Sequence, residues 1–462
     1  METLEIDKIE LERIISKSEY HFNDFKSKRI QPSKLQETFV AFANADGGDL
    51  YIGIEDKEHL GERVVGFSEV EEANDIITVL LEQTSPSVEN LIIEFLKTES
   101  MGIILHISIP KSPKVHYTAS GDCYIRVNAS KSKIKGERIT QLSYSKGAEP
   151  YEKKIVEHIE INDITESQYF KDYIKRIESK QSPELFLKKQ RLLTKSGDNL
   201  FPNTGCVLLF DEEPQASMNT RCAIKVYRIR SSDKEYKREQ LFEMPFTVNG
   251  PIEACIKKTI SKVKELLDGA SFHDGKNLIK LNYPAEALKE ILVNAVIHRD
   301  YSLNDDIHVK IYDNRVEIIS PGRLPGYMTT DNLYDERFSR NPNIVRMLHN
   351  LPNPLNHDIG EGLDTARNEL KKAGLVAPDF EEKENSFIVR IRHQRIASVE
   401  DVILSYIEEN PQAIITNRLV RQLSGENDVN KVKKALQKLR TESVLKLKDE
   451  KAPTFKYEYI KA

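Results

Sequence analysis

The sequence predicts an α/β (α+β) protein of several domains, on three observations. Its 462 residues exceed the roughly 250–300 residues that a single hydrophobic core usually serves. Segments in which apolar residues recur with helical spacing alternate with short segments of apolar and polar alternation. The composition, 39% hydrophobic and 31% charged, is typical of a soluble globular chain. We expect domains at residues 1–148, 149–275, 276–396 and 397–462.

Helical spacing in the first domain predicts helices at residues 8–16, 34–45 and 71–83. Period-two alternation predicts strands at residues 22–27, 49–56, 92–98, 102–110 and 123–128. The second domain shows helical patterns at 167–178, 183–193 and 252–267 and strand patterns at 205–210 and 222–230. It contains no motif that indicates a function.

The third domain begins with a helical pattern at 284–299, followed by strand patterns at 306–313 and 315–322. A polar loop, a helix at 362–374 and a strand at 386–393 complete it. The fourth domain has three helical patterns and a pair of strands at 444–449 and 455–460.

Charge and cysteine content limit the class of protein. The net charge of -5 gives no overall attraction to nucleic acid, so such binding depends on local basic clusters. The four cysteines form no C-x-x-C pair, which favours buried thiols in a reducing compartment over disulfides or a zinc site. No uninterrupted apolar run reaches roughly 18 residues. We expect a cytoplasmic protein without a membrane anchor.

The helix in "EILVNAVIHRDY" carries a polar stripe on an otherwise apolar surface. Glu290, Asn294 and His298 are spaced at i, i+4 and i+8 and share one face. The pattern suits either a solvent-exposed face or a ligand site. The downstream segments "SPGRLP", "FSRNPNI" and "IGEGLDTAR" favour the ligand site.

Residues 276–395 resemble the nucleotide site of the ATPase superfamily that includes gyrase, MutL, histidine kinases and a heat-shock chaperone, known as the Bergerat fold. The resemblance implies that ATP binds there with magnesium. It assigns Glu290 as the catalytic residue that polarises the attacking water and Asn294 as a magnesium ligand. A P-loop motif is absent from the sequence.

The same resemblance assigns further nucleotide contacts. Gly322 belongs to "SPGRLP", where Ser320 replaces the aspartate that reads adenine in the family. Gly360 and Gly362 open a helix whose backbone amides approach the phosphates. Arg340 belongs to the lid and contacts a phosphate, and His298 completes the polar stripe of the site.

The segments "SEYHFNDFKS", "FVAFANADGGDLYIGIEDKEHLGERVVGF" and "CYIRVNASKSKI" resemble the Schlafen-type, AlbA-like domain from about Ser18 to Gln141. In members that are nucleases, three acidic residues bind a divalent metal. The resemblance carries these catalytic metal ligands, for Mg or Mn, to Glu19, Asp24 and Asp56. Asp24 stands where the family usually has glutamate. A domain that only binds nucleic acid is the alternative.

Basic residues near these acids predict contacts to the phosphates of RNA or DNA. Lys26 lies beside the predicted acidic site, together with Lys28 and Arg29. A second group follows the last strand of the domain and comprises Arg126, Lys131, Lys133 and Lys135. Such charge runs also occur on ordinary solvated faces.

Residues 398–462 resemble a winged helix. On its third helix, apolar spacing predicts a buried stripe of Val429, Val432, Leu436 and Leu439. The opposite face carries Lys431, Lys434 and Lys438, which we predict to bind nucleic acid in a major groove. A protein-interaction module is the alternative.

Together these features predict an ATP-binding protein that acts on nucleic acid. The first hypothesis is a nucleotide-gated, metal-dependent nuclease of Schlafen-like type, with a role in anti-phage defence suggested by the family alone. The second hypothesis is an ATP-sensing, DNA-binding transcriptional regulator that does not cleave. We also expect a homo-oligomer.

Overall fold

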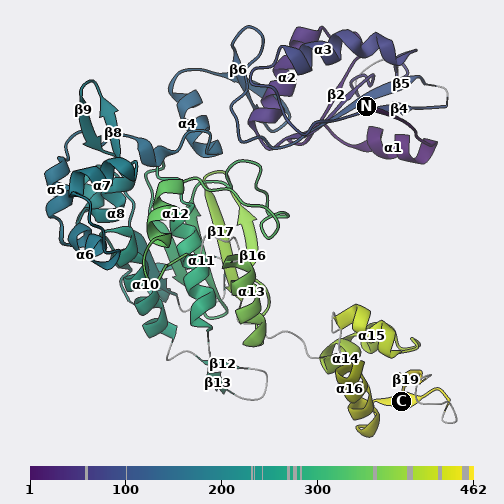
Figure 1. The fold of residues 1–462 in the computed structure, drawn as a ribbon. Helices are drawn as coiled ribbons and strands as arrows, with labels where there is room; N and C mark the ends of the chain where they lie inside the picture. The colour runs from purple at the N-terminus through teal and green to yellow at the C-terminus, as the bar shows by residue number, and fades with distance from the viewer. Residues whose placement is uncertain are drawn as a thin grey trace. The chain divides into compact units, whose positions relative to one another are not determined.

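The computed structural model of the protein describes residues 1–57, 61–99, 101–229, 231, 233, 235–241, 243–267, 271–273, 278–280, 283–356, 362–392, 399–424, 429–449 and 457–462. The chain divides into two compact units, residues 1–370 with 377–392 and residues 371–376 with 393–462. Both units mix helices with sheets (Figure 1), which confirms the predicted α/β multidomain class.

The first unit begins with a five-stranded mixed sheet. Its strand order is β1 (Glu2–Glu5), β4 (Ile92–Lys97), β5 (Ile103–Ile109), β3 (Gly48–Ile52) and β2 (Asn23–Lys26). The pairs β1 with β4 and β2 with β3 are parallel, and Asp24 lies opposite Leu50. Strand β2 therefore forms one edge of the sheet.

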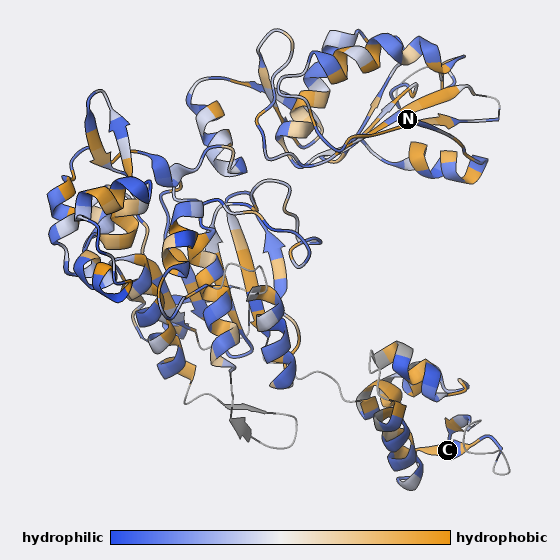
Figure 2. Cartoon of the chain, in the orientation of Figure 1, coloured by the Kyte–Doolittle hydropathy of each residue, from blue (hydrophilic) through white to orange (hydrophobic). Residues whose placement is uncertain are grey.

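Both faces of this sheet are covered because alternate strand residues point to opposite sides. Leu50 and Ile52 pack with α2 (Pro32–Asn44) and α3 (Asn74–Glu82), whereas Tyr51 packs with α1 (Lys8–Ser16). Figure 2 shows hydrophobic residues concentrated along the strands of this sheet.

The glycine pair between α2 and β3 permits a close approach of backbone to backbone. Gly47 has φ +77° and Gly48 has φ +146°, values that other residues rarely adopt. A Cβ atom would lie 2.3 Å from the carbonyl oxygen of Ile109 at Gly47 and 2.7 Å from that of Phe22 at Gly48. The strand can therefore start directly against β5 and the segment before β2.

A hairpin and a helix complete this part of the unit. The hairpin β6 (Cys123–Val127) and β7 (Ser130–Ile134) packs on α2. Asn44 at the end of α2 donates hydrogen bonds to the carbonyls of His116 and Tyr124, at 2.8 and 2.9 Å. Helix α4 (Glu137–Lys146) then ends at Gly147, which has φ +73°.

A second, six-stranded sheet follows, in the order β11 (Phe246–Val248), β10 (Ile224–Arg228), β14 (Ile307–Ile311), β15 (Arg315–Pro321), β17 (Ser386–Arg392) and β16 (Asp379–Glu382). Strand β10 is parallel to β14, with Val226 opposite Val309. Strands from both sides of the boundary expected at residue 275 thus share one sheet. Helices α10 (Ile252–Leu267) and α11 (Ala285–Ile297) pack together, and α11 contacts β15.

Short helices surround a buried helix, α8 (Thr204–Phe210), before that sheet. They are α5 (Ile161–Glu166), α6 (Gln168–Arg176), α7 (Pro183–Lys189) and α9 (Pro214–Ser217), with the hairpin β8 (Leu193–Ser196) and β9 (Asn199–Pro202). The prediction of a strand at 205–210 is wrong, because these residues belong to helix α8. Asn203 caps the helix by accepting a hydrogen bond from the backbone N–H of Cys206 at 3.1 Å.

Helix α12 (Pro342–His349) occupies part of the segment expected to be a polar loop. Its first turn is capped by the buried carboxylate of Glu152, which accepts hydrogen bonds from the N–H groups of Asn343 and Ile344 at 2.8 and 3.0 Å. Helix α13 (Gly362–Lys372) precedes β16. The remaining short elements are the strands β12 (Ser271–His273) and β13 (Leu278–Lys280) and the 3-10 helices Val70–Ala73, Tyr151–Lys153 and Arg238–Gln240.

The second unit contains α14 (Val399–Glu409), α15 (Asn417–Ser424) and α16 (Val429–Thr441), followed by the antiparallel pair β18 (Leu445–Leu447) and β19 (Tyr459–Lys461). The predicted stripe on α16 is partly wrong. Val432, Leu436 and Leu439 are buried, but Val429 is exposed and Ala435 is buried in its place. Val429 is the first residue of the helix, so it lies beyond the core.

None of the helices in the described parts of the chain has the length and apolar character that crossing a bilayer requires.

Candidate functional site

The predicted polar stripe of α11 faces a cavity of about 450 Å³ beside β15 and the first turn of α13. Glu290 and Asn294 lie one helical turn apart on the cavity side, and His298 caps the end of the helix. Gly322, after β15, and Gly362, at the start of α13, also line the cavity. Five of the residues predicted to form the nucleotide site therefore surround one cavity.

Gly362 lies against the two polar residues of α11. A Cβ atom built on Gly362 would lie 2.8 Å from Glu290 Oε2 and 3.4 Å from Asn294 Nδ2. Real Cβ contacts below 3.0 Å are essentially never seen, so only glycine fits without a shift. Gly360, the other predicted glycine of this segment, lies outside the described residues.

His298 is held neutral in this environment. Burial, together with the nearby charge of Arg340, lowers the pKa of His298 to about 4. Its Nδ1 atom is buried and has no hydrogen-bond partner among the described residues. A ligand in the cavity would meet a neutral imidazole with an unused polar atom.

Arg340 was predicted to contact a phosphate, but it does not line the cavity. Its guanidinium is buried and donates hydrogen bonds to the carbonyls of His298, Ser145 and Arg323, at 3.1, 2.8 and 2.7 Å. The side chain therefore ties three backbone segments together behind the site. Gly322, with φ +107°, makes room for it, because a Cβ atom there would lie 2.7 Å from Arg340 Nη1.

Ser320 joins β15 to α11 by donating a hydrogen bond to the carbonyl of Ala295 at 2.6 Å. The apolar wall of the cavity includes Met328, Leu333, Phe338, Phe387 and Val389. Phe387 and Val389 lie in the strand predicted at 386–393, but the other three come from the segment expected to be a polar loop. Their irregular spacing fits neither a helix nor a strand, so periodicity could not reveal them.

The N-terminal acids form a pair that is neutralised by cations. Lys26 Nζ forms a short ion pair with Asp24 and lies 3.5 Å from Glu19 Oε1. Arg126, which is buried, donates to Asp24 Oδ2 at 2.7 Å. Burial raises the pKa of Glu19, and its hydrogen bond with Asp24 raises it further. Burial opposes ionisation of Asp24, but Lys26, Glu19 and Arg126 together lower its pKa.

The structure does not bring Asp56 into this pair. No group of three or more metal-ligating side chains occurs among the described residues. Each carboxylate oxygen of Asp24 already forms an ion pair, one with Lys26 and the other with Arg126. The residues present therefore do not fit a divalent metal, because such an ion would have to displace two cations from the same carboxylate.

Several cations predicted to hold phosphates are instead paired with protein groups. Arg126 is buried, as described above. Lys131 lies 3.0 Å from a carboxylate oxygen of Glu37, and Lys133 lies 2.6 Å from one of Asp122. Sequence proximity identified these charges but could not reveal their partners.

In the second unit, Lys434 and Lys438 are exposed on α16, as predicted. Lys438 Nζ lies 3.8 Å from Glu400 Oε1. The side chain of Lys431 lies outside the described residues.

A charged cluster links the cavity loop to the N-terminal part of the first unit. Arg323 follows Gly322 and donates to Asp46 Oδ1 at 2.7 Å and to Glu382 Oε2 at 3.2 Å. Lys111 donates to the carbonyls of Leu324 and Met328, at 2.9 and 3.0 Å. Arg323, Leu324 and Met328 all line the cavity.

Asp46 is the centre of this cluster. Its other oxygen lies 2.6 Å from His21 Nε2. Burial alone would raise the pKa of Asp46, but the His21 hydrogen bond and the charges of Arg323 and Lys111 lower it to about 2. Asp46 therefore stays ionised at physiological pH. Asp46 directly precedes Gly47 and Gly48, and no local pattern marks it as a functional residue.

Two family models match parts of the chain. Residues 19–135 match the family described as "Schlafen, AlbA_2", and residues 304–391 match the family described as "Putative ATP-dependent DNA helicase recG C-terminal". The chain thus contains a Schlafen AlbA_2 domain and an ATPase-like domain, which supports ATP use and an association with nucleic acid.

No curated protein matches the chain. A solved structure, the DIP2311 protein from Corynebacterium diphtheriae, is similar at 16% identity over 98% of this chain and 83% of that chain, with a TM-score of 0.42. A TM-score below 0.5 does not establish a shared fold.

Proposed function

We propose that this protein binds nucleic acid and that ATP in the α11 cavity regulates the binding. The observation that carries the proposal is the convergence of Glu290, Asn294 and Gly362 on one cavity, where a Cβ atom on Gly362 would lie 2.8 Å from Glu290 Oε2. The family match over residues 19–135 supports the association with nucleic acid, and the match over residues 304–391 supports the use of ATP.

The residues of the cavity fit a nucleotide. The start of α13 at Gly362 offers backbone N–H groups for phosphates, and the positive end of the helix dipole favours negative charge there. Asn294 supplies a side-chain oxygen suited to magnesium, which prefers oxygen ligands and retains waters. The apolar wall around Phe338 and Phe387 suits a nucleobase. Magnesium bound with the nucleotide would offset phosphate charge.

The charged cluster provides a route from the nucleotide to the Schlafen domain. Arg323 lines the cavity and pairs with Asp46, which belongs to the turn that leads into β3. A ligand that moves the loop around Arg323 would alter this pair and so change the position of the turn. Coupling between two sites requires such differential contacts.

Binding without cleavage is the better-supported activity of the N-terminal domain. A nuclease of the predicted kind needs a metal held by carboxylates, and Asp24 is occupied by Lys26 and Arg126. The exposed Lys434 and Lys438 on α16 would add a second contact to nucleic acid, if the second unit acts as a winged helix.

The proposal is tested by titration of the full-length protein with ATP and magnesium, followed by nucleic-acid binding with and without ATP. We expect the wild type to bind ATP and its affinity for RNA or DNA to change when ATP is present. Asn294→Ala should weaken ATP binding and remove the effect of ATP. The matched control Asn368→Ala, at an exposed position of α13, should leave both unchanged.

Three results would contradict the proposal. A folded wild-type protein that binds no nucleotide at millimolar concentration would remove the regulatory role of the cavity. Unchanged ATP binding by Asn294→Ala would show that the nucleotide occupies another site. Cleavage of RNA or DNA that requires added Mg or Mn would restore the nuclease hypothesis.

A further inference from the structure

We propose that Tyr20 and Phe22 form a stacking platform for unpaired bases of a single-stranded nucleic acid. The inference rests on the proposed nucleic-acid binding and specifies its substrate class. It is carried by two exposed aromatic rings on a turn whose backbone is fixed by buried contacts.

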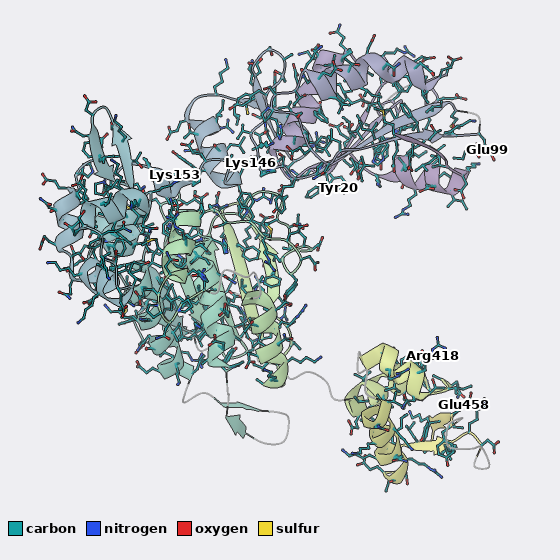
Figure 3. The ribbon with its side chains drawn as sticks, in the orientation of Figure 1. Tyr20, Glu99, Lys146, Lys153, Arg418 and Glu458 are labelled. Carbon is teal, nitrogen blue, oxygen red and sulfur yellow. The ribbon has the colours of Figure 1, made fainter. Side chains whose placement is uncertain are left out.

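The exposure of these rings is unusual for a turn. Tyr20 is 50% exposed and Phe22 is 45% exposed, and their ring centroids lie 6.1 Å apart at an interplanar angle of 69°. Turn positions usually carry Gly, Pro, Asn, Asp or Ser. In Figure 3 the Tyr20 side chain projects away from the strands of the N-terminal sheet. The two rings are therefore available to a partner that offers a flat apolar surface.

The backbone beneath the rings is held in place by Arg126. Its buried guanidinium donates to the carbonyls of Tyr20, His21 and Asn23, at 2.7, 3.2 and 3.2 Å. The N–H of Asp49 donates to the carbonyl of Phe22 at 2.8 Å. Because the turn is fixed before a ligand arrives, little ordering entropy is lost on binding. Arg126, predicted to contact phosphates, thus positions the aromatic rings.

The charges along edge strand β2 indicate a nucleic acid as the occupant. Residues 17–29 contain four cations, Lys17, Lys26, Lys28 and Arg29, and two acids, Glu19 and Asp24. Lys28 donates to the carbonyl of Gly66 at 2.7 Å, and Arg29 is exposed with no carboxylate partner among the described residues. The positive charges of Lys28 and Arg29 are therefore available to bind a phosphate.

The spacing of rings and cations suits an extended strand. Four residues of β2 separate the turn from the loop with Lys28 and Arg29, about 13 Å at roughly 3.3 Å per residue. Single-stranded sites of roughly 4 to 16 nucleotides combine such cationic tracks with aromatic stacking. A duplex keeps its bases stacked on each other and cannot use the rings in this way.

The first experiment compares affinities for single-stranded oligo(dT) and oligo(U), an abasic oligonucleotide of the same length, and a duplex. Tyr20→Leu and Phe22→Leu retain apolar volume but remove the aromatic face. Stacking is worth roughly 1–3 kcal/mol per base, so each change should weaken single-strand binding about 5- to 150-fold. Duplex and abasic binding, and the salt dependence of binding, should not change. Phe246→Leu, at a ring 43% exposed on β11, is the matched control and should have no effect.

The second experiment uses fluorescence, because the chain contains no tryptophan. Phe22→Trp provides a single reporter, and a stacked base should quench its emission when oligo(dT) is added. Phe246→Trp should show no quenching.

The outcomes separate this inference from the proposed function. If the wild type binds single strands but both leucine variants bind equally well, the platform is wrong and nucleic-acid binding stands. If the wild type binds no nucleic acid with or without ATP, both proposals fail. If Phe22→Leu instead dissociates an oligomer in sedimentation and leaves nucleic-acid binding unchanged, the rings belong to a protein interface and the platform is overturned.

Discussion

Gly362→Ala should separate ligand binding from folding at the α11 cavity. The added Cβ would lie 2.8 Å from Glu290 Oε2, whereas ordinary contacts begin near 3.4 Å, so one group must move by roughly 0.6 Å. Glu290 is buried but lines the cavity, so its carboxylate would move into the space that a ligand needs. A shift of this size would misalign about one polar contact to the nucleotide, and a hydrogen bond contributes roughly 0.5–1.5 kcal/mol. We therefore expect ATP affinity to fall by up to about tenfold, or about 1.4 kcal/mol.

The fold should tolerate this change. Alanine has a higher helix propensity than glycine, by up to about 1 kcal/mol, and Gly362 opens α13. We expect thermal unfolding to shift little while calorimetric ATP binding weakens. Asn368→Ala adds alanine to an exposed position of the same helix and should keep wild-type ATP affinity. Wild-type affinity in Gly362→Ala, with α13 still folded, would refute the argument that Gly362 is required for the site.

Two further predictions concern other charges. Replacing Lys434 and Lys438 with Gln should weaken duplex DNA binding and flatten its dependence on salt, since fewer counterions are released; an unchanged salt slope would assign α16 to protein contacts. Burial lowers the pKa of Lys146 to about 7 from 10.5, so the unfolded chain binds more protons between these values and stability should rise with pH across that window. Lys146→Met should remove this rise, and hydrogen exchange of α4 between pH 7 and 10 would detect it.

Periodicity predicted most of the longer elements of the first unit. The helices α2, α10 and α11 and the strands β3, β5 and β15 occur where their patterns predicted them. The prediction failed at 205–210, because a helix buried on all sides has no polar stripe and its short apolar run looks like a strand. It also missed β1, whose four residues are all exposed and show no alternation.

The candidate site was predictable where its residues share one helix or belong to a glycine segment of the resemblance, as Gly322 and Gly362 do. Glu290 and Asn294 follow from a helical spacing of four residues. The contact between Arg323 and Asp46 joins residues 277 positions apart, and neither residue carries a local pattern that names its partner. Arg126 and Arg340 show the opposite error. The charge of Arg126 and the resemblance of the Arg340 segment to a lid suggested phosphate contacts. Burial and hydrogen bonds to backbone carbonyls, which a sequence does not display, decide their roles.

The pair of Asp46 and Arg323 offers the sharpest test of communication between the two domains. Both groups are largely withdrawn from water, with side-chain exposures of 10% and 33%, and their closest atoms are 2.7 Å apart. Asp46→Asn keeps the shape but removes the charge that Arg323 and Lys111 share. Arg323→Met removes the other partner. If the pair transmits the effect of ATP, each single change should reduce the ATP-dependent shift in nucleic-acid affinity, and the double variant should lose no more than the singles.

The size of this coupling and its control can be stated in advance. Allosteric coupling is typically 1–3 kcal/mol, so the ATP-dependent shift in the wild type should be roughly 5- to 150-fold and should approach onefold in the variants. Asp313→Asn provides the matched control, because Asp313 pairs with Arg228 at the same 2.7 Å distance and does not line the cavity. Since the pKa of Asp46 is about 2, the shift should not vary between pH 5.5 and 8 through this group. If the reductions of the ATP-dependent shift in the two single variants add up in the double variant, Asp46 and Arg323 act through separate routes.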